Sequence, residues 1–201
     1  MIDEPAVRTG VVAPALTAEH PGLWLAWTEV AATPAPTPPE LRRRLAAMAD
    51  RIRGAEAIAL RGREIPHCYR VFFRQVGLDP DVVRTPVEAL MLRRLWDGGL
   101  LPRNLVEDAL TVAVLETGVG VWAFDADHLV GELGLREADD RRIVVADDEG
   151  TVAVLFGDPS PRAAITRRTH NVALVAVAVP NVPDVYVQEA LWTAWDILRT
   201  N

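Results

Sequence analysis

Residues 104–135 limit the fold of this chain more than any other stretch, because a helix pattern and a strand pattern meet within it. Asn104 followed by Glu107 is the spacing that caps a helix N-terminus, with hydrogen bonds from side chain to backbone in both directions. Apolar residues continue at helical spacing to Gly118, which supplies a left-handed stop. A short aromatic turn at 122–125 then leads into a strand-like run. We expect this helix and turn to form one wall of a pocket.

Helix patterns concentrate before residue 118 and strand patterns after it, and one helix pattern comes last. This order predicts an α+β fold with N-terminal helices, one mixed β-sheet and a C-terminal helix. The expected helices are 38–53, 66–76, 86–97, 104–117 and 183–199, and the expected strands are 131–137, 142–146, 151–156 and 172–179. Two earlier apolar runs, 11–16 and 23–32, are strands or a strand and a loop.

Local signals set several of these boundaries. Residues 37–40 and 85–88 both have the spacing of a capping box with proline at the start of the helix. Gly54 is expected to close the first long helix, and residues 57–60 form a short apolar run. The sequence DDEG at 147–150 is typical of a hairpin turn.

Half of the residues are apolar, which indicates a globular chain. The length suits a single domain over 1–201, with an N-terminal extension at 1–39. No apolar run approaches the roughly eighteen residues of a membrane span, and the acidic start MIDEPAVRTG has no secretory leader pattern. One cysteine, Cys68, excludes an internal disulfide. A cytoplasmic location is therefore expected.

The charge is uneven along the chain, whose net charge is −7 and whose 21 basic residues are all arginine. Residues 41–103 carry a net +6, whereas 104–201 carry −9. Such asymmetry is typical of a side that faces a polyanion, although arginines are also common on ordinary helix surfaces. The candidates for contact with RNA are Arg42, Arg43, Arg51, Arg93 and Arg94.

Common catalytic and metal motifs do not stand out. The four histidines lie far apart with no paired spacing, so no metal site is predicted. Residues 125–128 with Glu132 could hold a cation, but Asp in such a stretch more often caps its own turn. No glycine-rich phosphate loop is present, and no cofactor is predicted. Ser160 lies between two prolines, which is unlike a nucleophile. Trp122 is either a packing residue or a ligand-stacking residue.

An ordered set of short motifs extends over residues 64–180. It comprises Tyr69-Arg70, Gly77 to Pro80, Thr85-Pro86, Leu95, Gly99, Asn104 to Asp108, Ala123 to Asp125, Asp127, Leu129, Val145 to Asp147, Ile165-Thr166 and Thr169 to Val172. In this order and spacing the chain resembles the B3/B4 domain of the phenylalanyl-tRNA synthetase beta subunit. It resembles even more closely small stand-alone proteins that share that domain.

The resemblance implies a central pocket on an α+β scaffold. In the synthetase, that pocket hydrolyses tyrosine wrongly attached to the tRNA for phenylalanine. Trp122 stands here in place of the family's pocket histidine, and Thr111 in place of its helix asparagine. The acidic residue that reads the tyrosine hydroxyl falls near Ser160, where Asp158 is the nearest carboxylate. The scaffold is therefore similar to the family, and the synthetase's editing site is not.

Three functions remain open. The chain binds tRNA or its aminoacyl end, or it is a trans-acting hydrolase of aminoacyl-tRNA with altered specificity, or it binds a small molecule resembling an amino acid. No catalytic role is assigned to any residue. The pocket candidates are Arg84, Glu88, Asn104, Asp108, Thr111, Trp122, Asp125, Arg162, Thr166 and His170.

Overall fold

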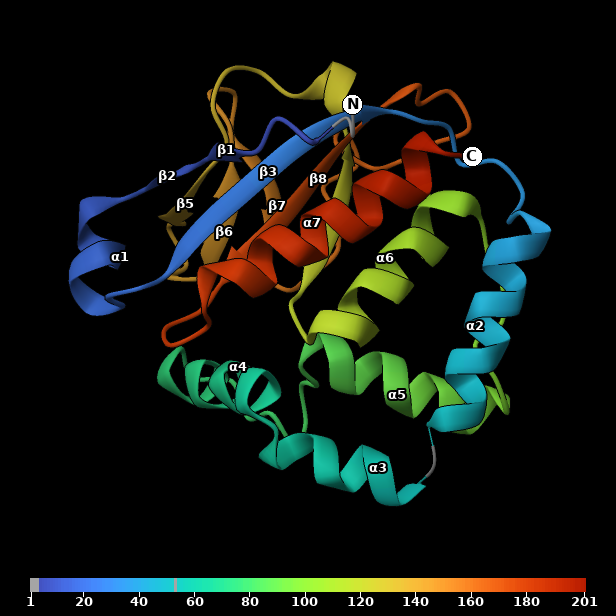
Figure 1. Cartoon of the computed structure of the whole chain (residues 1–201). Coiled ribbons are helices and arrows are strands. Elements are labelled where there is room, and N and C mark those ends of the chain that lie inside the picture. The colour runs from blue at the N-terminus through green and yellow to red at the C-terminus, as the bar shows by residue number, and fades with distance from the viewer. Residues whose placement is uncertain (1–3, 53) are drawn as a thin grey trace.

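The computed structural model describes residues 4–52 and 54–201, and it confirms the α+β fold class (Figure 1). The strands form two four-stranded sheets, where one sheet was expected. The helices are α1 Pro14–Glu19, α2 Pro39–Arg51, α3 Gly54–Ala59, α4 Glu64–Gln75, α5 Pro86–Asp97, α6 Leu105–Thr117 and α7 Asp184–Arg199. Short 3-10 turns span Leu60–Gly62 and Ala126–His128.

The first sheet is fully antiparallel and has the strand order β1-β3-β8-β4. Its strands are β1 Arg8–Thr9, β3 Trp24–Ala31, β4 Val121–Asp125 and β8 Asn171–Ala178. Helices α6 and α7 cover one face of this sheet, and the second sheet lies behind it (Figure 1). Because both faces are covered, every residue of β8 after Asn171 is buried.

The second sheet has the order β2-β5-β6-β7 and is mixed, because β2 pairs with β5 in parallel. Its strands are β2 Val11–Val12, β5 Gly134–Glu137, β6 Ile143–Ala146 and β7 Thr151–Val154. The hairpin turn predicted between β6 and β7 is confirmed. Asp147 organises this turn, since its Oδ1 accepts hydrogen bonds from the backbone N–H groups of Glu149 and Gly150, each at 3.0 Å.

Helices α3, α4 and α5 lie below the sheets in Figure 1, and α4 joins this layer to them. The buried hydroxyl of Tyr69 donates to the carbonyl of Val177 at 2.6 Å and accepts from the N–H of Gly120 at 3.1 Å. Phe72 and Phe73 beside it are completely buried. One face of α4 therefore holds the ends of β4 and β8 in place.

The predicted helix caps have different outcomes. The capping box at Thr85 and Glu88 is confirmed in both directions. Asn104 caps α6 by accepting from the Glu107 N–H at 3.0 Å, but the return bond runs from its side-chain amide, and not its backbone, to Glu107. The box at Thr37 is wrong: Pro38 is the N-cap residue of α2 and makes no side-chain cap bond, while Thr37 donates to Asp108 instead.

Other local predictions are corrected by tertiary contacts. The expected aromatic turn at 122–125 is strand β4, because pairing with β8 satisfies its backbone groups. Helix α2 ends at Arg51, and Gly54 begins the next helix rather than closing this one. The run 57–60 is helical, and the run 11–16 divides between β2 and α1.

Two statements concern only the described part of the chain. No helix within it is both long and apolar enough to cross a membrane. Arg53, expected at the end of the first basic helix, lies outside the described residues, as do residues 1–3.

Candidate functional site

A pocket of about 780 Å³ opens beside Trp122. It lies between the N-terminal half of α6, strand β4 and the loop at 158–167, which leads toward β8. Its volume falls within the range of small-molecule sites. The polar and aromatic residues that line it are Arg103, Asn104, Glu107, Trp122, Asp158, Thr166 and Arg167.

Trp122 forms a fixed wall of this pocket. It pairs with Val175 in the central strand β8, and its ring lies 5.4 Å from the ring of Phe156. The side chain is half-buried, so one part packs in the core and another faces the pocket. Trp122 therefore packs in the core and also presents part of its aromatic surface to the pocket.

The start of α6 supplies one polar side of the pocket. Asn104 and Glu107 are held together by the cap bonds, and Arg103 forms an ion pair with Glu107 at 3.1 Å. All three side chains line the pocket and face solvent in part. The cap therefore fixes an amide, a carboxylate and a guanidinium at one rim.

The loop at 158–170 supplies the opposite side, where Asp158, Thr166 and Arg167 line the pocket. The Thr166 N–H donates to the hydroxyl of Thr169 at 2.9 Å, and that hydroxyl donates to the buried carboxylate of Asp125 at 2.6 Å. Asp125 thus holds the loop from behind and does not line the pocket.

Asp125 also caps its own turn at residues 125–128. Its carboxylate accepts from the N–H of Asp127 at 3.2 Å, which is the turn-capping role that the sequence favours. His128 Nδ1 lies 3.2 Å from the same carboxylate. In the residues that the structure describes, no three His, Cys, Asp or Glu side chains gather as metal ligands.

Arg162 anchors the same loop to the β6–β7 turn. Its guanidinium donates to both oxygens of Asp147, at 2.6 and 3.0 Å, and to the carbonyl of His128 at 2.7 Å. Burial alone would raise the pKa of Asp147, but Arg162 and backbone N–H donors outweigh it and hold the pKa below its usual range. Arg162 therefore supports the pocket without lining it.

A smaller cavity of about 220 Å³ continues the pocket between α5 and α6, since the two share Glu107, Leu110 and Val121. Thr111 and Arg93 line this part. Thr111 donates to the carbonyl of Glu107 at 2.9 Å, so its hydroxyl serves the helix. Burial, together with the neighbouring charge of Arg103, lowers the pKa of Arg93. We call the pocket and this cavity together the α6 groove.

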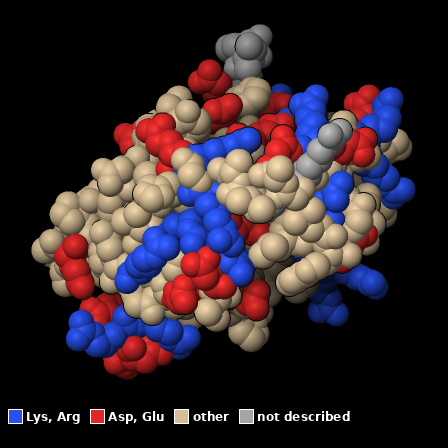
Figure 2. Space-filling model, turned by 90° about the horizontal axis from the view of Figure 1, so that it is seen from below, with Lys and Arg blue, Asp and Glu red and all other residues tan. Residues whose placement is uncertain are grey.

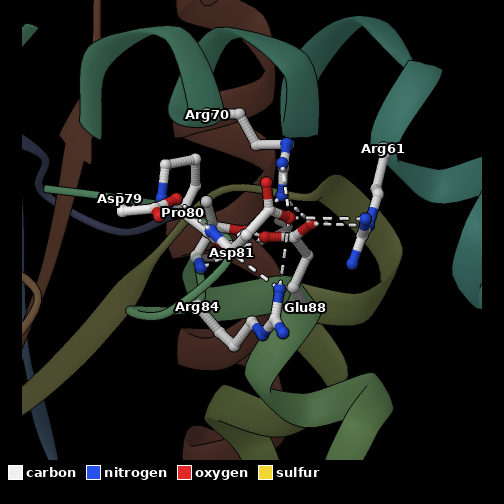
Figure 3. Close-up of polar contacts among 8 residues, drawn as sticks. Arg61, Arg70, Asp79, Pro80, Asp81, Arg84 and Glu88 are labelled. Atoms are coloured by element: carbon white, nitrogen blue, oxygen red, sulfur yellow. Dashed lines mark hydrogen bonds and ion pairs between the residues drawn. The ribbon is translucent and has the colours of Figure 1, made fainter. Parts of the chain in front are cut away.

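Arg84 and Glu88 lie elsewhere, in a cluster at the start of α5 (Figure 3). Glu88 is buried and lies 2.7 Å from the buried guanidinium of Arg70, which also binds Asp81 at 2.9 Å. Arg84 donates to the carbonyl of Pro80 at 3.2 Å. The pair between Arg70 and Glu88 joins α4 to α5, and neither Arg84 nor Glu88 lines the α6 groove.

Asp108 and His170 are also outside the groove. The buried carboxylate of Asp108 accepts from the hydroxyl of Thr37 and from the backbone N–H of Arg103. Burial raises its pKa. His170 is exposed and accepts a hydrogen bond from Ala32 through its backbone carbonyl.

The arginines proposed to face RNA are divided. Arg42 and Arg94 donate to the backbone carbonyls of Thr37 and Ala49, and Arg43 pairs with Glu40. Arg51 is exposed at the end of α2, and Arg93 lies in the α6 groove. Seen from below, arginines gather over the helical layer with acidic side chains among them (Figure 2). The local excess of arginine does not make an unbroken basic surface there.

Of the predicted pocket residues, the structure brings together Asn104, Thr111, Trp122 and Thr166 along the α6 groove. Sequence reasoning missed Arg103 and Arg167 as lining residues. Arg103 directly precedes the helix cap, which was a usable signal. Arg167 lies in an irregular loop whose course no local pattern predicts.

Comparison with known proteins gives a partial match. The phenylalanine–tRNA ligase beta subunit of Psychrobacter arcticus is 27% identical over 123 residues. The match covers 53% of this chain and 15% of that subunit, so the chain corresponds to a small part of it. No protein-family model matches the chain. The chain is thus similar in sequence to a segment of a tRNA ligase subunit.

Proposed function

We propose that the α6 groove binds the 3′ end of a tRNA that carries an amino acid. The observation that carries this proposal is the pairing of opposite charges around one aromatic wall. Arg103 and Arg167 lie at the pocket with Glu107 and Asp158, and Trp122 lies beside them. The partial similarity to a tRNA ligase subunit supports the same class of ligand.

The balance of charges favours the aminoacyl end over bare RNA. An aminoacyl end has negative phosphates and a positive α-amino group, so it can use both the guanidinium and the carboxylate groups. Bare RNA offers only negative charge and would be repelled by Asp158 and Glu107. Terminal bases have aromatic faces, which stack on side chains such as Trp122.

Arg167 is the best residue with which to test phosphate binding. It is exposed, and within the described part of the chain no ion pair engages it. Arg103 is already paired with Glu107, so less of its attraction is available to a phosphate. Arg136 on β5 serves as a matched control, because it is an exposed arginine that does not line the groove.

The experiment is fluorescence anisotropy with total tRNA, uncharged and charged, at about 50 and about 200 mM salt. We expect charged tRNA to bind more tightly, and Arg167→Gln to weaken binding and to reduce the slope of log K against log salt by about one. Arg136→Gln should leave both values unchanged. Absence of binding at the lower salt, or equal effects of the two variants, contradicts the proposal.

Hydrolysis of the bound ester is a second candidate, favoured by the presence of Asp158 and Thr166 at the pocket. A carboxylate and a hydroxyl at that wall could orient an attacking water. Release of amino acid from the bound aminoacyl-tRNA measures this hydrolysis directly. Binding without release leaves a binding module, and Asp158→Asn should abolish any release that occurs.

A further inference from the structure

We propose that a second cavity, on the side of the molecule formed by α1, is a binding site for a small organic amine. The cavity has a volume of about 410 Å³ and lies between α1, the end of α4 and strands β5 to β7. It shares no lining residue with the α6 groove. Its lining includes Leu16, Glu19, His20, Ile143, Leu155 and Phe156.

The wall of the cavity is apolar and fixed. Leu16, Ile143 and Leu155 line it while being largely buried in the core. Phe156 has a φ of +64°, a backbone region that bulky residues rarely adopt. Its ring lies 4.8 Å from the ring of Phe73 and contacts three other aromatic rings. Strain of this kind persists where the surroundings hold it, and it is common at ligand sites.

His20 places a polar group at this wall without a partner. The residue is 7% exposed, and its ring meets the ring of Phe72 edge-on at 5.2 Å. Among residues 4–52 and 54–201, no side chain or backbone group forms a hydrogen bond with either ring nitrogen. Neither ring nitrogen is among the buried unpaired atoms of the described chain, so each remains accessible to water or to a ligand. His20 can therefore form a hydrogen bond with a polar group at the inner end of a ligand.

The charged residues that line the cavity determine which ligand charge is favoured there. Two ion pairs, Glu137 with Arg141 at 3.1 Å and Asp140 with Arg142 at 2.6 Å, neutralise four of the lining charges. Glu19 has no ion partner in the part of the chain that the structure describes. The cavity thus has a net charge of one negative unit, and a positive group on the ligand is favoured there.

These three features together define the ligand class. An apolar body fits against the buried wall, a hydroxyl or similar group reaches His20, and an ammonium group lies near Glu19. A carboxylate in place of the ammonium would be repelled. The site does not depend on the proposed tRNA binding, because the two sites have separate linings.

A matched pair of rigid probes tests the proposal, namely para-hydroxymethyl-benzylamine and para-hydroxymethyl-benzoate. The readout is the NMR shift of methyl signals from Leu16 and Leu155 during titration of the full chain. We expect the amine to shift these signals in a saturable way and the acid to leave them unmoved. Equal binding of the two probes, or no shift with the amine, overturns the proposal.

Variants locate the contacts. Glu19→Gln should weaken amine binding by about threefold, the effect of one exposed charge. Glu132→Gln is the matched control, because it removes an exposed carboxylate outside the cavity and should have no effect. His20→Phe keeps the ring contact and should weaken binding by about fivefold through loss of one hydrogen bond.

Because His20 is buried, a folding defect in His20→Phe would also lower amine binding. A second variant, at a less buried position of the same cavity, separates the two causes. Leu78 is half-buried at the cavity, so Leu78→Trp should block entry with little change to the core. Circular dichroism establishes that each variant is folded. Undiminished amine binding by folded Leu78→Trp, or equal affinities of Glu19→Gln and Glu132→Gln, would refute the assignment of this cavity.

Discussion

Arg162→Met is the substitution that most directly tests how the pocket loop is held. Arg162 lies in the loop at 158–170, whereas its partner Asp147 lies in the β6–β7 turn. The side chain of Asp147 is fully buried, and that of Arg162 is 29% exposed. Methionine approximates the apolar part of the arginine side chain and lacks the guanidinium group. The variant therefore leaves Asp147 buried without its ionic partner.

The structure limits the size of the loss. Removal of one member of a buried ion pair costs about 3–5 kcal/mol. Asp147 keeps three backbone N–H donors, those of Val130, Glu149 and Gly150, each at 3.0 Å. With these donors left and Arg162 partly exposed, we expect a loss of about 2–3 kcal/mol in the free energy of unfolding. That loss corresponds to a decrease in Tm of about 4–12 °C for a chain of this size.

The loss should also depend on pH. The pKa of Asp147 is below its ordinary value in the folded state, so the ionised carboxylate stabilises the fold above the unfolded pKa. This stabilisation disappears as the pH falls through the folded pKa. The difference between the original chain and Arg162→Met is therefore greatest above about pH 4 and decreases below it.

Urea unfolding at neutral pH and in acid measures both effects. Arg168→Met is the matched control, because Arg168 is an exposed arginine of the same loop, and no ion pair engages it in the described chain. The control should change the stability by less than about 0.5 kcal/mol. If the two variants lose the same stability, or if the difference persists unchanged in acid, the reasoning is wrong. If Arg162 holds the loop in this way, Arg162→Met should also weaken binding in the α6 groove.

Two further predictions concern the bonds between α4 and its neighbours. Glu88→Ala should lower the free energy of unfolding by about 2–3 kcal/mol, because it removes one of the two carboxylates paired with the buried Arg70 guanidinium and also breaks the α5 capping box. A loss under about 1 kcal/mol in urea unfolding would contradict this. Tyr69→Phe should cost about 1–3 kcal/mol through the hydrogen bonds to Val177 and Gly120. Because burial raises the pKa of Tyr69, its phenolate should form only as the chain unfolds in alkali. Tyr69→Phe should therefore remove the part of the phenolate absorbance that appears on alkaline unfolding. Phenolate formation at Tyr69 before any loss of circular dichroism would contradict the assignment.

The sequence predicted the elements whose signals are local. The cap at Asn104, the box at Thr85 and the left-handed glycine at 118 each act within one helical turn, so they are visible without a structure. Residues 122–125 were misassigned as a turn because their strand conformation depends on pairing with β8, about fifty residues later in the chain. Thr37 was misassigned as a cap because its hydroxyl is used by Asp108, which no local pattern indicates.

The candidate site was predicted less completely, for a related reason. Arg84 and Glu88 have the charge expected of pocket residues, but they serve the ion cluster between α4 and α5 (Figure 3). Asp125 and Arg162 hold the pocket loop in place from behind. Whether a polar side chain faces a ligand or another part of the protein depends on distant partners. A sequence pattern identifies the residue and leaves its partner open.

The arginines show how this limit affects functional inference. In the sequence, residues 41–103 form a basic block, which indicates a basic face. In the structure, Arg43, Arg44 and Arg70 of that block are paired with carboxylates, so much of its charge is neutralised. The α6 groove contains Arg93 and Arg103 of this block together with Arg167 from the pocket loop. Burial, and after it the charge of Arg103, lowers the pKa of Arg93. Anion binding should therefore depend most on Arg167, which no ion pair engages in the described chain, and exchange of Arg167 should matter more than exchange of Arg43, which is paired with Glu40.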